Sequence, residues 1–520
     1  MIKSQNYFAF SRSGEYSSDD GMHKFPFVLN SKKEIHSTFD SFLIRGESAD
    51  EKTISTESGN VKIWESQNFF ILSENPDFIM RSGLAVRRIL NLKRSLGYSK
   101  LLYIPGISDP YLIPVWMLLG VDVFDDINAI MEGSHAIRYT IFGRAGDVND
   151  QTENNISFLE DEVDLLARSI ENGTFFNVVE RFNVSPKSME IIRHLETIFF
   201  NNFEKNFPRY TPKILAGGLD SMRRPDVKRF NSYIQTEYSK KNMSDIALFI
   251  PCSARKPYSR SKSHMRLIEA IYPFRNHVHE IILTSPIALV PRELEDTYPP
   301  RFYDIPVTGQ WYEEEKNQIE GILKEYVRRN NYKHIIFFLP EDMKFVEDFG
   351  ISGHFVPWKK HESNEFEDLL DILRKITEDK KHEKRDFLKE KMIAIADYQF
   401  GSWISTYTKD MKVTRMFNQF MLTLDGKPYF IFNEDMGKLT IHRDASWIFL
   451  KEGKWLVEID DFKPTANIYA MGVRDCSEQV RQGDEVVIHH NGEARGVGTA
   501  RMSAEMMKMN ERGIAVKVRN

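Results

Sequence analysis

Short apolar runs alternate with helix-length amphipathic segments through the first part of the chain. Leu101-Leu102-Tyr103-Ile104 is an apolar run that ends at a Pro-Gly turn, 111–120 has helical spacing, and 121–125 is the next apolar run. A strand–helix–strand rhythm of this kind is typical of parallel α/β architecture. The apolar spacing also predicts helices over 160–172 and 186–203. We expect a first domain over 1–212.

The region 213–364 shows the same rhythm, with longer apolar runs. In chain order, the pattern predicts a helix over 223–240, a strand over 246–250, a helix over 264–271, a strand over 281–284, a helix over 313–330 and a strand over 335–339. This order indicates a doubly wound α/β core domain, in which ligands bind at the carboxyl ends of the strands. The polar loop that starts at Pro251-Cys252 follows one of these ends.

The last third of the chain changes character twice. Residues 365–396 form a charged helical stretch that we interpret as a connector, and 403–454 have the pattern of a small α+β piece, which together give a third region over 365–454. Residues 455–520 are all-β in pattern. Their turn signals are Gly483, Asn491-Gly492, Gly496, Gly498 and Gly513.

Composition narrows the class of protein. With 520 residues, 41% apolar and 28% charged, the chain is expected to be a soluble globular protein of about three to five domains. It lacks a long apolar run and an apolar leader segment, so we expect a cytoplasmic protein with no membrane anchor. The two cysteines cannot supply a disulfide framework or a multi-cysteine zinc cluster, and no metal site is expected.

Charge distribution is more informative than the net charge of -5. Residues 221–270 hold eleven Lys/Arg against four Asp/Glu, an excess that could meet a phosphate backbone or simply form a solvated helix face. The apolar stretch 198–203 could be core or interface. A homo-oligomer is the default expectation.

The pattern Pro251-Cys252-x3-Lys256-Pro257-Tyr258-x2-Ser261-x2-His264, hereafter the signature loop, gathers several reactive side chains. A thiol, an amine, a phenol, a hydroxyl and an imidazole at a strand end are what nucleophilic or acid–base catalysis needs. Arg255, Lys256 and His264 could favour a thiolate at Cys252. The alternatives are that Cys252 is a small buried hydrophobe and that His264 makes a backbone hydrogen bond at a helix start.

The C-terminal region resembles a PUA domain, an RNA-binding barrel found on many RNA-modifying enzymes. The resemblance rests on Met471-Gly472-Val473, Gly483-Asp484-Glu485-Val486-Val487-Ile488, Gly496-Val497-Gly498-Thr499-Ala500, Met502-Ser503 and Gly513-Ile514-Ala515-Val516-Lys517-Val518. An unrelated small barrel is the alternative. Candidate tRNA contacts are Lys463, Arg474, Arg495 and Arg501.

The signature loop resembles that of the archaeosine synthases at every fixed position. Further matching segments are Thr284-Ser285-Pro286, 290–295, Tyr298-Pro299, Tyr303-Asp304 and Val307-Thr308-Gly309-Gln310-Trp311. The resemblance covers almost the whole chain. It implies a truncated TIM-barrel-like transglycosylase domain at the N-terminus and a PUA domain at the C-terminus.

The N-terminal region resembles tRNA-guanine transglycosylases at Tyr103-Ile-Pro-Gly-Ile-Ser-Asp109-Pro110 and Gly120-Val-Asp122-Val-Phe124-Asp125-Asp126. In that family, the acidic residue at the position of Asp125 attacks the ribose. The zinc-binding cysteines and the Asp-Ser-Gly-Gly-Phe-Gln segment of those enzymes are absent here. We therefore expect a remnant pocket for a deazaguanine base rather than base exchange. The alternative is a simple acidic turn.

The resemblance implies an enzyme that acts on tRNA carrying 7-cyano-7-deazaguanine in its D-arm. It implies that lysine adds to the nitrile as co-substrate, with glutamine as the other candidate donor, and that a radical-SAM partner enzyme releases the finished base. No cofactor is identified from the sequence. We expect Cys252 to form a thioimidate, with His264 or Lys256 moving the proton. In a rival mechanism the amine attacks directly and Asp125 protonates the nitrile. The substrate-binding candidates are Arg255, Tyr258, Ser261, Ser285, Glu293 and Asp304.

Two other functions stay open at this stage. The chain could be a true transglycosylase, or a tRNA-binding protein without catalytic activity.

Overall fold

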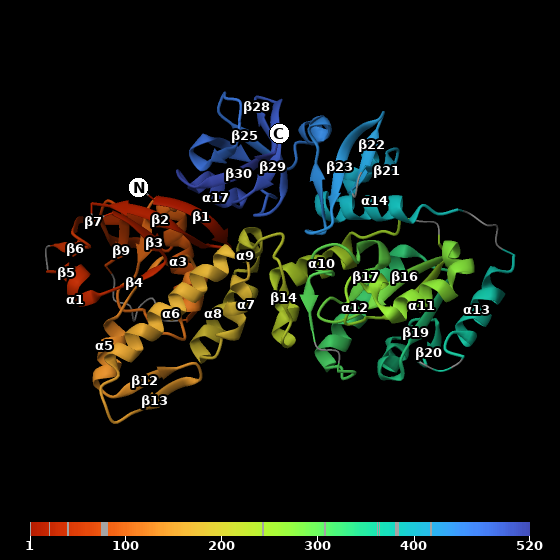
Figure 1. The fold of residues 1–520 in the computed structure, drawn as a ribbon, viewed down its shortest axis with the longest axis horizontal. Helices are drawn as coiled ribbons and strands as arrows, with labels where there is room; N and C mark the ends of the chain where they lie inside the picture. The colour runs from red at the N-terminus through yellow and green to blue at the C-terminus, as the bar shows by residue number, and fades with distance from the viewer. Residues whose placement is uncertain are drawn as a thin grey trace. The chain divides into compact units, whose positions relative to one another are not determined.

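The computed structural model describes residues 2–19, 21–38, 41–73, 82–241, 244–305, 308–360, 362, 364–379, 384–416 and 419–519 (Figure 1). Val307, which belongs to one of the matching segments, lies outside them. The chain forms two compact units. The first joins residues 1–212 to 449–520, and the second is 213–448.

The N-terminal part of the first unit is built on a near-closed, barrel-like sheet. Its strands, in spatial order, are β4 (Phe27–Leu29), β11 (Val123–Asp125), β10 (Leu101–Tyr103), β9 (Phe69–Leu72), β8 (Gly59–Glu65), β7 (Glu47–Thr56), β6 (Phe42–Ile44) and β5 (Ile35–Ser37). The first four pair in parallel and the others are antiparallel. Every one of these strands sends an apolar side chain into one shared core, so the sheet curls around it.

A three-stranded antiparallel sheet and a set of helices complete this part. The strands are β1 (Ile2–Phe8), β2 (Ser11–Ser18) and β3 (Gly21–Phe25). The helices are α1 (Ser31–Glu34), α3 (Ser82–Leu96), α4 (Ile113–Leu118), α5 (Ile127–Ser134), α6 (Thr152–Glu171), α7 (Phe175–Arg181), α8 (Pro186–Glu196) and α9 (Phe200–Asn206). A second apolar core joins Leu102 and Phe124 to helical residues such as Ile89 and Leu166, so β10 and β11 are buried on both faces.

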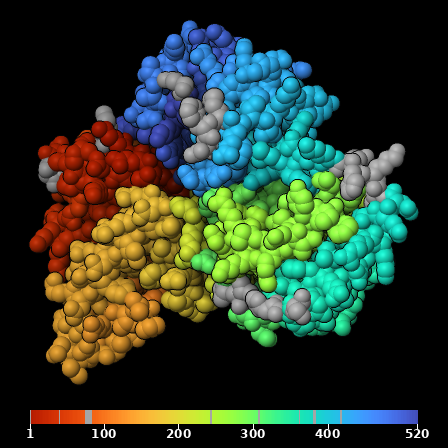
Figure 2. Space-filling model, turned by 45° about the vertical axis from the view of Figure 1, so that its right-hand side comes forward, coloured from red at the N-terminus to blue at the C-terminus, as the bar shows by residue number. Residues whose placement is uncertain are grey.

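The predicted elements of this part are largely confirmed, with one correction. The strands at 101–104 and 121–125 and the helix between them are present as β10, β11 and α4. The single helix predicted over 186–203 is wrong, because α8 ends at Glu196 and α9 starts at Phe200. A hairpin that was not predicted, β12 (Ile137–Thr140) and β13 (Gly143–Gly146), belongs to the orange lobe at the lower left of Figure 2.

The C-terminal part of the first unit is a curled six-stranded sheet. Its spatial order is β26 (Asn467–Tyr469), β30 (Ile514–Arg519), β29 (Glu493–Ala500), β28 (Glu485–His490), β25 (Leu456–Ile459) and β27 (Val473–Cys476), with α17 (Ala504–Met509) before the last strand. Asn491 and Gly492 join β28 to β29 with positive φ angles of 48° and 81°. Both residues of a tight type I′ hairpin turn need positive φ, which explains why the Asn-Gly signal predicted this turn.

The second unit is centred on a five-stranded sheet that is parallel except for one edge strand. Its order is β17 (Leu289–Pro291), β16 (Val278–Leu283), β15 (Ile246–Pro251), β19 (His334–Leu339) and β20 (His354–Pro357), with β17 antiparallel. Every residue of β15 and β16 is buried, as expected for a sheet covered on both faces. Its helices include α10 (Pro225–Thr236), α11 (Lys262–Ala270), α12 (Glu313–Asn330) and α13 (Glu367–Thr377).

The remaining elements of the second unit follow the sheet in the chain. A short pair joins β14 (Ile214–Leu215) to β18 (Tyr303–Asp304). The others are α14 (Phe387–Phe400), α15 (Ser405–Thr408), the antiparallel sheet β21 (Lys412–Met416), β22 (Gln419–Leu424), β23 (Lys427–Asn433) and β24 (Lys438–Ile441), and α16 (Ser446–Glu452), which spans the boundary between the units. Residues 394–400 of α14 are all buried, so residues 394–396, which end the predicted charged stretch, belong to a core helix. Among the described residues, no helix has the length and apolar character needed to cross a membrane.

Candidate functional site

The signature loop leaves the sheet at the carboxyl end of β15, beside a cavity of about 210 Å³. The backbone N–H of Cys252 still donates to the carbonyl of Leu283 at 3.1 Å, so the sheet pairing extends to the first residue of the loop. The side chain of Cys252 is half-buried. Polar and charged residues that line the cavity with it are Thr284, Ser285, Thr308, Gln310, Glu315, Asp342 and Lys360.

The cavity lies where the fold predicts a ligand site. Cys252 follows β15, Thr284 follows β16, and Asp342 comes soon after the end of β19. The carboxyl ends of neighbouring parallel strands meet at one edge, which is the usual ligand position in such sheets. Glu315 lies in the first turn of α12, and its carboxylate accepts the N–H of Tyr312 at 2.8 Å.

The thiol of Cys252 is not held as a thiolate. Enclosure raises the pKa of Cys252, and this effect outweighs a hydrogen bond from Thr284 and the ammonium groups of Lys256 and Lys360. The cations that act on the thiol are therefore Lys256 and Lys360. Arg255, which the sequence also suggested, has an exposed side chain.

Lys256 lies against the rings of two tyrosines, Tyr258 and Tyr303. Its ammonium nitrogen is 4.0 Å from the centroid of the Tyr303 ring. Burial lowers the pKa of Lys256, and the opposing influence of Cys252 and Asp304 is smaller. A lysine of this kind gives up its proton more readily than an exposed one.

Hydroxyl groups form a chain behind the thiol. The buried Tyr258 and Tyr303 share a hydrogen bond of 2.6 Å between their hydroxyl oxygens, and Tyr303 is also 2.6 Å from the Thr284 hydroxyl. Since Thr284 lines the cavity beside Cys252, this chain fixes the wall next to the thiol.

Ser261 and His264 shape the end of the loop. The Ser261 side chain accepts the N–H of His264 at 3.3 Å and caps α11, whose start it thereby fixes. Nε2 of the buried His264 lies 3.0 Å from the carbonyl oxygen of Pro251, and Nδ1 lies 3.0 Å from a terminal nitrogen of Arg292. Burial, followed by the charge of Arg292, lowers the pKa of His264 to about 3.

The other substrate-binding candidates divide into three kinds. Ser285 lines the cavity. Asp304 is exposed and pairs with Lys213 at 2.9 Å. Glu293 is buried between Tyr238 and His279; although burial alone would raise its pKa, His279 and Tyr238 lower it to about 2.

Asp125 lies in the first unit, at the end of β11, and is fully buried. Its Oδ2 accepts the Tyr103 hydroxyl at 3.0 Å and the N–H of Gly106 at 2.6 Å, while Oδ1 accepts the N–H of Ile127 at 3.1 Å. Burial raises the pKa of Asp125, although these donors act in the opposite direction. Its carboxylate is thus enclosed and hydrogen-bonded on both oxygens.

Comparison with known proteins connects these features. A family model described as "PUA domain" matches residues 461–520, and one described as "Domain of unknown function (DUF5591)" matches residues 227–375, which include the signature loop. The archaeosine synthase subunit alpha of Thermoplasma acidophilum is 40% identical over 519 residues, covering 100% of both chains. The chain belongs to the archaeosine synthase alpha-subunit family.

A second archaeosine synthase agrees with this assignment, and a transglycosylase shows a weaker similarity. The archaeosine synthase subunit alpha of Methanosarcina acetivorans is 31% identical over 484 residues, which cover 83% of this chain and 76% of that protein. A tRNA-guanine(15) transglycosylase of Methanobrevibacter smithii is 25% identical over 407 residues, covering 72% of this chain and 54% of that protein. This archaeosine synthase homologue is an enzyme acting on tRNA, as the family does.

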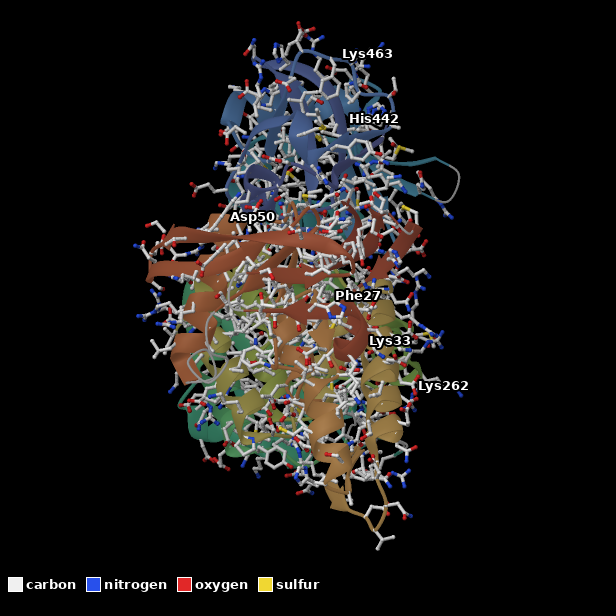
Figure 3. All side chains as sticks on the ribbon, turned by 90° about the vertical axis from the view of Figure 1, so that its left-hand side faces the viewer. Phe27, Lys33, Asp50, Lys262, His442 and Lys463 are labelled. Atoms are coloured by element: carbon white, nitrogen blue, oxygen red, sulfur yellow. The ribbon has the colours of Figure 1, made fainter. Side chains whose placement is uncertain are left out.

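The PUA domain of this archaeosine synthase homologue carries the four basic residues suggested for tRNA binding. Lys463 and Arg501 are exposed, and Lys463 lies on the outer surface of the domain (Figure 3). Arg474 pairs with Asp460 at 2.7 Å, and Arg495 pairs with Asp461 at 3.0 Å. The latter two must exchange a carboxylate for a phosphate if they bind RNA.

Three charged cavity residues were missed by sequence reasoning, namely Glu315, Asp342 and Lys360. Asp342 could have been found, because it follows the predicted strand at 335–339 in the position where doubly wound sheets place ligands. Lys360 follows β20, an edge strand that was not predicted, and Glu315 is one of three consecutive glutamates, so neither had a distinct signal.

Proposed function

We propose that this chain adds the amine of lysine to the nitrile of 7-cyano-7-deazaguanine in the D-arm of tRNA, giving an amidine on the way to archaeosine. The proposal goes beyond the family membership of the chain, because it names the reaction and the amine donor. The observation that carries it is the half-buried thiol of Cys252, which lines the cavity. In this reading, the second unit is the doubly wound catalytic core, and the N-terminal sheet is a truncated transglycosylase-like barrel.

The chemistry requires no oxidant or reductant. The Cys252 sulfur bonds to the nitrile carbon, and the thiol proton passes to the nitrile nitrogen, which gives a thioimidate. The amine then bonds to the same carbon, the carbon–sulfur bond breaks, and the sulfur regains a proton lost by the amine. A thiol that is neutral at rest, as the raised pKa of Cys252 implies, brings the required proton to the nitrile itself.

Lys256 is the group best suited to move protons in this sequence. Its charge acts on Cys252, and burial lowers its pKa, so it can accept a proton from the thiol or the incoming amine and return it. His264 is less suited, because its side chain does not line the cavity and both of its ring nitrogens already have partners.

The cavity offers charges of both signs to an amino acid. The carboxylates of Glu315 and Asp342 can attract an ammonium group, and the ammonium of Lys360 can attract a carboxylate. This supports an amino-acid donor such as lysine, and glutamine is the other candidate. The PUA domain and the basic surface of residues 221–270 would hold the tRNA, and a radical-SAM partner enzyme would release the finished base.

The test is mass spectrometry of nucleosides from tRNA carrying 7-cyano-7-deazaguanine, after incubation with the chain and lysine. An added mass of lysine on the modified base is expected, and an unchanged nucleoside would refute the proposal. Glutamine in place of lysine tests the donor. Incorporation of labelled guanine instead would identify a transglycosylase.

The role of the thiol is tested with Cys252→Ala, and Cys476→Ala serves as the matched control because Cys476 is the other cysteine and is buried in the PUA domain. The first variant should lose adduct formation and the second should keep it. If Cys252→Ala forms the adduct at a near wild-type rate, the amine attacks directly. Asp125→Asn then tests whether that carboxyl protonates the nitrile.

A further inference from the structure

The peptide bond that carries Cys252 is held on both sides. Its carbonyl oxygen, which belongs to Pro251, lies 3.0 Å from Nε2 of His264. Its N–H donates to the carbonyl of Leu283 at 3.1 Å. The thiol is therefore attached to a peptide that the sheet holds through its N–H and that one buried imidazole contacts at its carbonyl oxygen.

Arg292, whose side chain is 11% exposed, determines which nitrogen of His264 carries the hydrogen. A guanidinium can only donate hydrogen bonds, so Nδ1 of His264, 3.0 Å from Arg292, must accept. The ring hydrogen is then on Nε2, where it donates to the Pro251 carbonyl. A protonated imidazole would place an N–H against the guanidinium, which disfavours that form.

Arg292 is itself fixed by two buried carboxylates. Its Nε donates to Glu280 at 2.8 Å, and a terminal nitrogen donates to Glu295 at 2.8 Å. Glu280 also accepts from Arg275 at 2.8 Å, and Glu295 accepts the backbone N–H of Ser259, within the signature loop, at 2.9 Å. The ring centroids of Tyr258 and Trp358 lie 6.0 and 6.2 Å from that of His264.

We propose that Arg292 and His264 are positioning residues for Cys252, with Arg292 fixing the imidazole and the imidazole fixing the Pro251–Cys252 peptide. Neither side chain lines the cavity. The inference rests on the proposed function only for its activity readout, since the reactivity of the thiol can be measured without tRNA.

The experiment uses the full chain with Cys476→Ala, which leaves Cys252 as the single thiol. His264→Gln, His264→Asn and His264→Ala are compared. A Gln amide can reach the place of Nε2 and still donate to the Pro251 carbonyl, whereas an Asn amide reaches only the place of Nδ1. The readouts are kcat and KM for adduct formation, and the rate of Cys252 alkylation by iodoacetamide as a function of pH.

His264→Gln should keep kcat within about threefold, whereas His264→Asn and His264→Ala should lower it about tenfold, the range of one lost hydrogen bond. The KM for the amine should not change. Alkylation should become about three- to tenfold faster in the Asn and Ala variants, with its pH profile moved to lower pH, because the thiol is less enclosed. Arg292→Met, which removes the donor to Nδ1 of His264, should behave like the Asn variant.

Far-UV circular dichroism and thermal unfolding show whether each variant is folded. If His264→Ala is not, the comparison of Gln with Asn carries the test. His490→Ala is the control for loss of a buried imidazole, since His490 lies 2.8 Å from the carbonyl of Ile459 in the other unit, and it should leave alkylation unchanged.

Two results would overturn the inference. A kcat for His264→Gln as low as that for His264→Ala would identify the imidazole as an acid–base group. Unchanged alkylation in His264→Ala would mean that it does not hold the thiol. Absence of adduct in the parent chain would instead count against the proposed function, and the alkylation comparison would still decide the positioning role.

Discussion

Replacing Asp122 by Ala should unfold the N-terminal barrel-like part at a markedly lower temperature. The carboxylate of Asp122 is buried and accepts from Nε and a terminal nitrogen of Arg12, both at 2.9 Å. It also accepts the backbone N–H of Leu102 at 2.9 Å. Arg12 is equally buried, so removal of the carboxylate leaves a guanidinium that solvent cannot reach.

The magnitude follows from the buried charge. Removing one partner of a buried ion pair typically costs about 3–5 kcal/mol, because the other charge is left uncompensated. Carbonyl oxygens of Tyr98 and Lys100 still accept from Arg12, which favours the lower end of that range. At about 2–4 °C per kcal/mol for a unit of this size, the transition should fall by about 6–20 °C.

The effect should also depend on pH, with a definite sign. Burial raises the pKa of Asp122, but the charges of Arg12 and Lys93 and the hydrogen bonds outweigh burial, so its pKa in the folded chain is lowered. The stabilisation is therefore complete above the pKa of an unfolded Asp, about 3.9, and is lost as the pH falls through the folded value. Wild type and variant should converge in stability in strong acid.

Thermal unfolding followed by differential scanning calorimetry measures the change, and Asp161→Ala on the exposed face of α6 is the control. The control should change stability by less than about 0.5 kcal/mol. A shift of less than about 2 °C for Asp122→Ala at neutral pH would refute the reasoning, because the charge of Arg12 would then be solvated or paired in another way.

Three other predictions concern the second unit and the PUA domain. The kcat of adduct formation should rise with pH through an apparent pKa below that of an ordinary lysine, because burial lowers the pKa of Lys256. Lys256→Met should abolish this rise of kcat with pH. An unchanged pH profile in that variant would contradict the proton-transfer role. Two single substitutions, Lys463→Ala and Arg501→Ala, should each weaken tRNA binding, measured by filter binding. Each should also reduce the slope of the logarithm of the binding constant against the logarithm of the salt concentration by about 1. Slopes equal to that of the wild type would mean that neither side chain contacts a phosphate. Gly513→Ala should lower the unfolding temperature by several degrees, since a Cβ there would lie 2.0 Å from the Tyr7 hydroxyl at a φ of 92°; an unshifted transition would mean that Tyr7 moves aside.

Much of the second unit could be predicted because its signals are local. The apolar runs at 246–250 and 335–339 are strands, and the helix expected over 313–330 has those bounds. The antiparallel strands β5 to β8 were not predicted individually, because polar residues such as Glu51 and Lys52 interrupt them and only pairing with neighbouring strands stabilises them. The break between α8 and α9 was missed for a similar reason, since the apolar spacing continues across it.

The signature loop shows why a sequence motif predicts the place of a candidate site better than it predicts the role of each residue in it. The sequence grouped Cys252, Lys256 and His264 because each is reactive in isolation. The fold separates them, because Cys252 lines the cavity and its pKa responds to Lys256, whereas His264 faces the Pro251 carbonyl and Arg292. Arg292 is 28 positions further along the chain, so its effect on the imidazole is visible only once β16 and β17 have brought it there. A histidine at a fixed position of such a loop can serve to hold a neighbouring nucleophile, and it can equally serve to move protons. The hydrogen-bond partners of its two ring nitrogens distinguish these explanations.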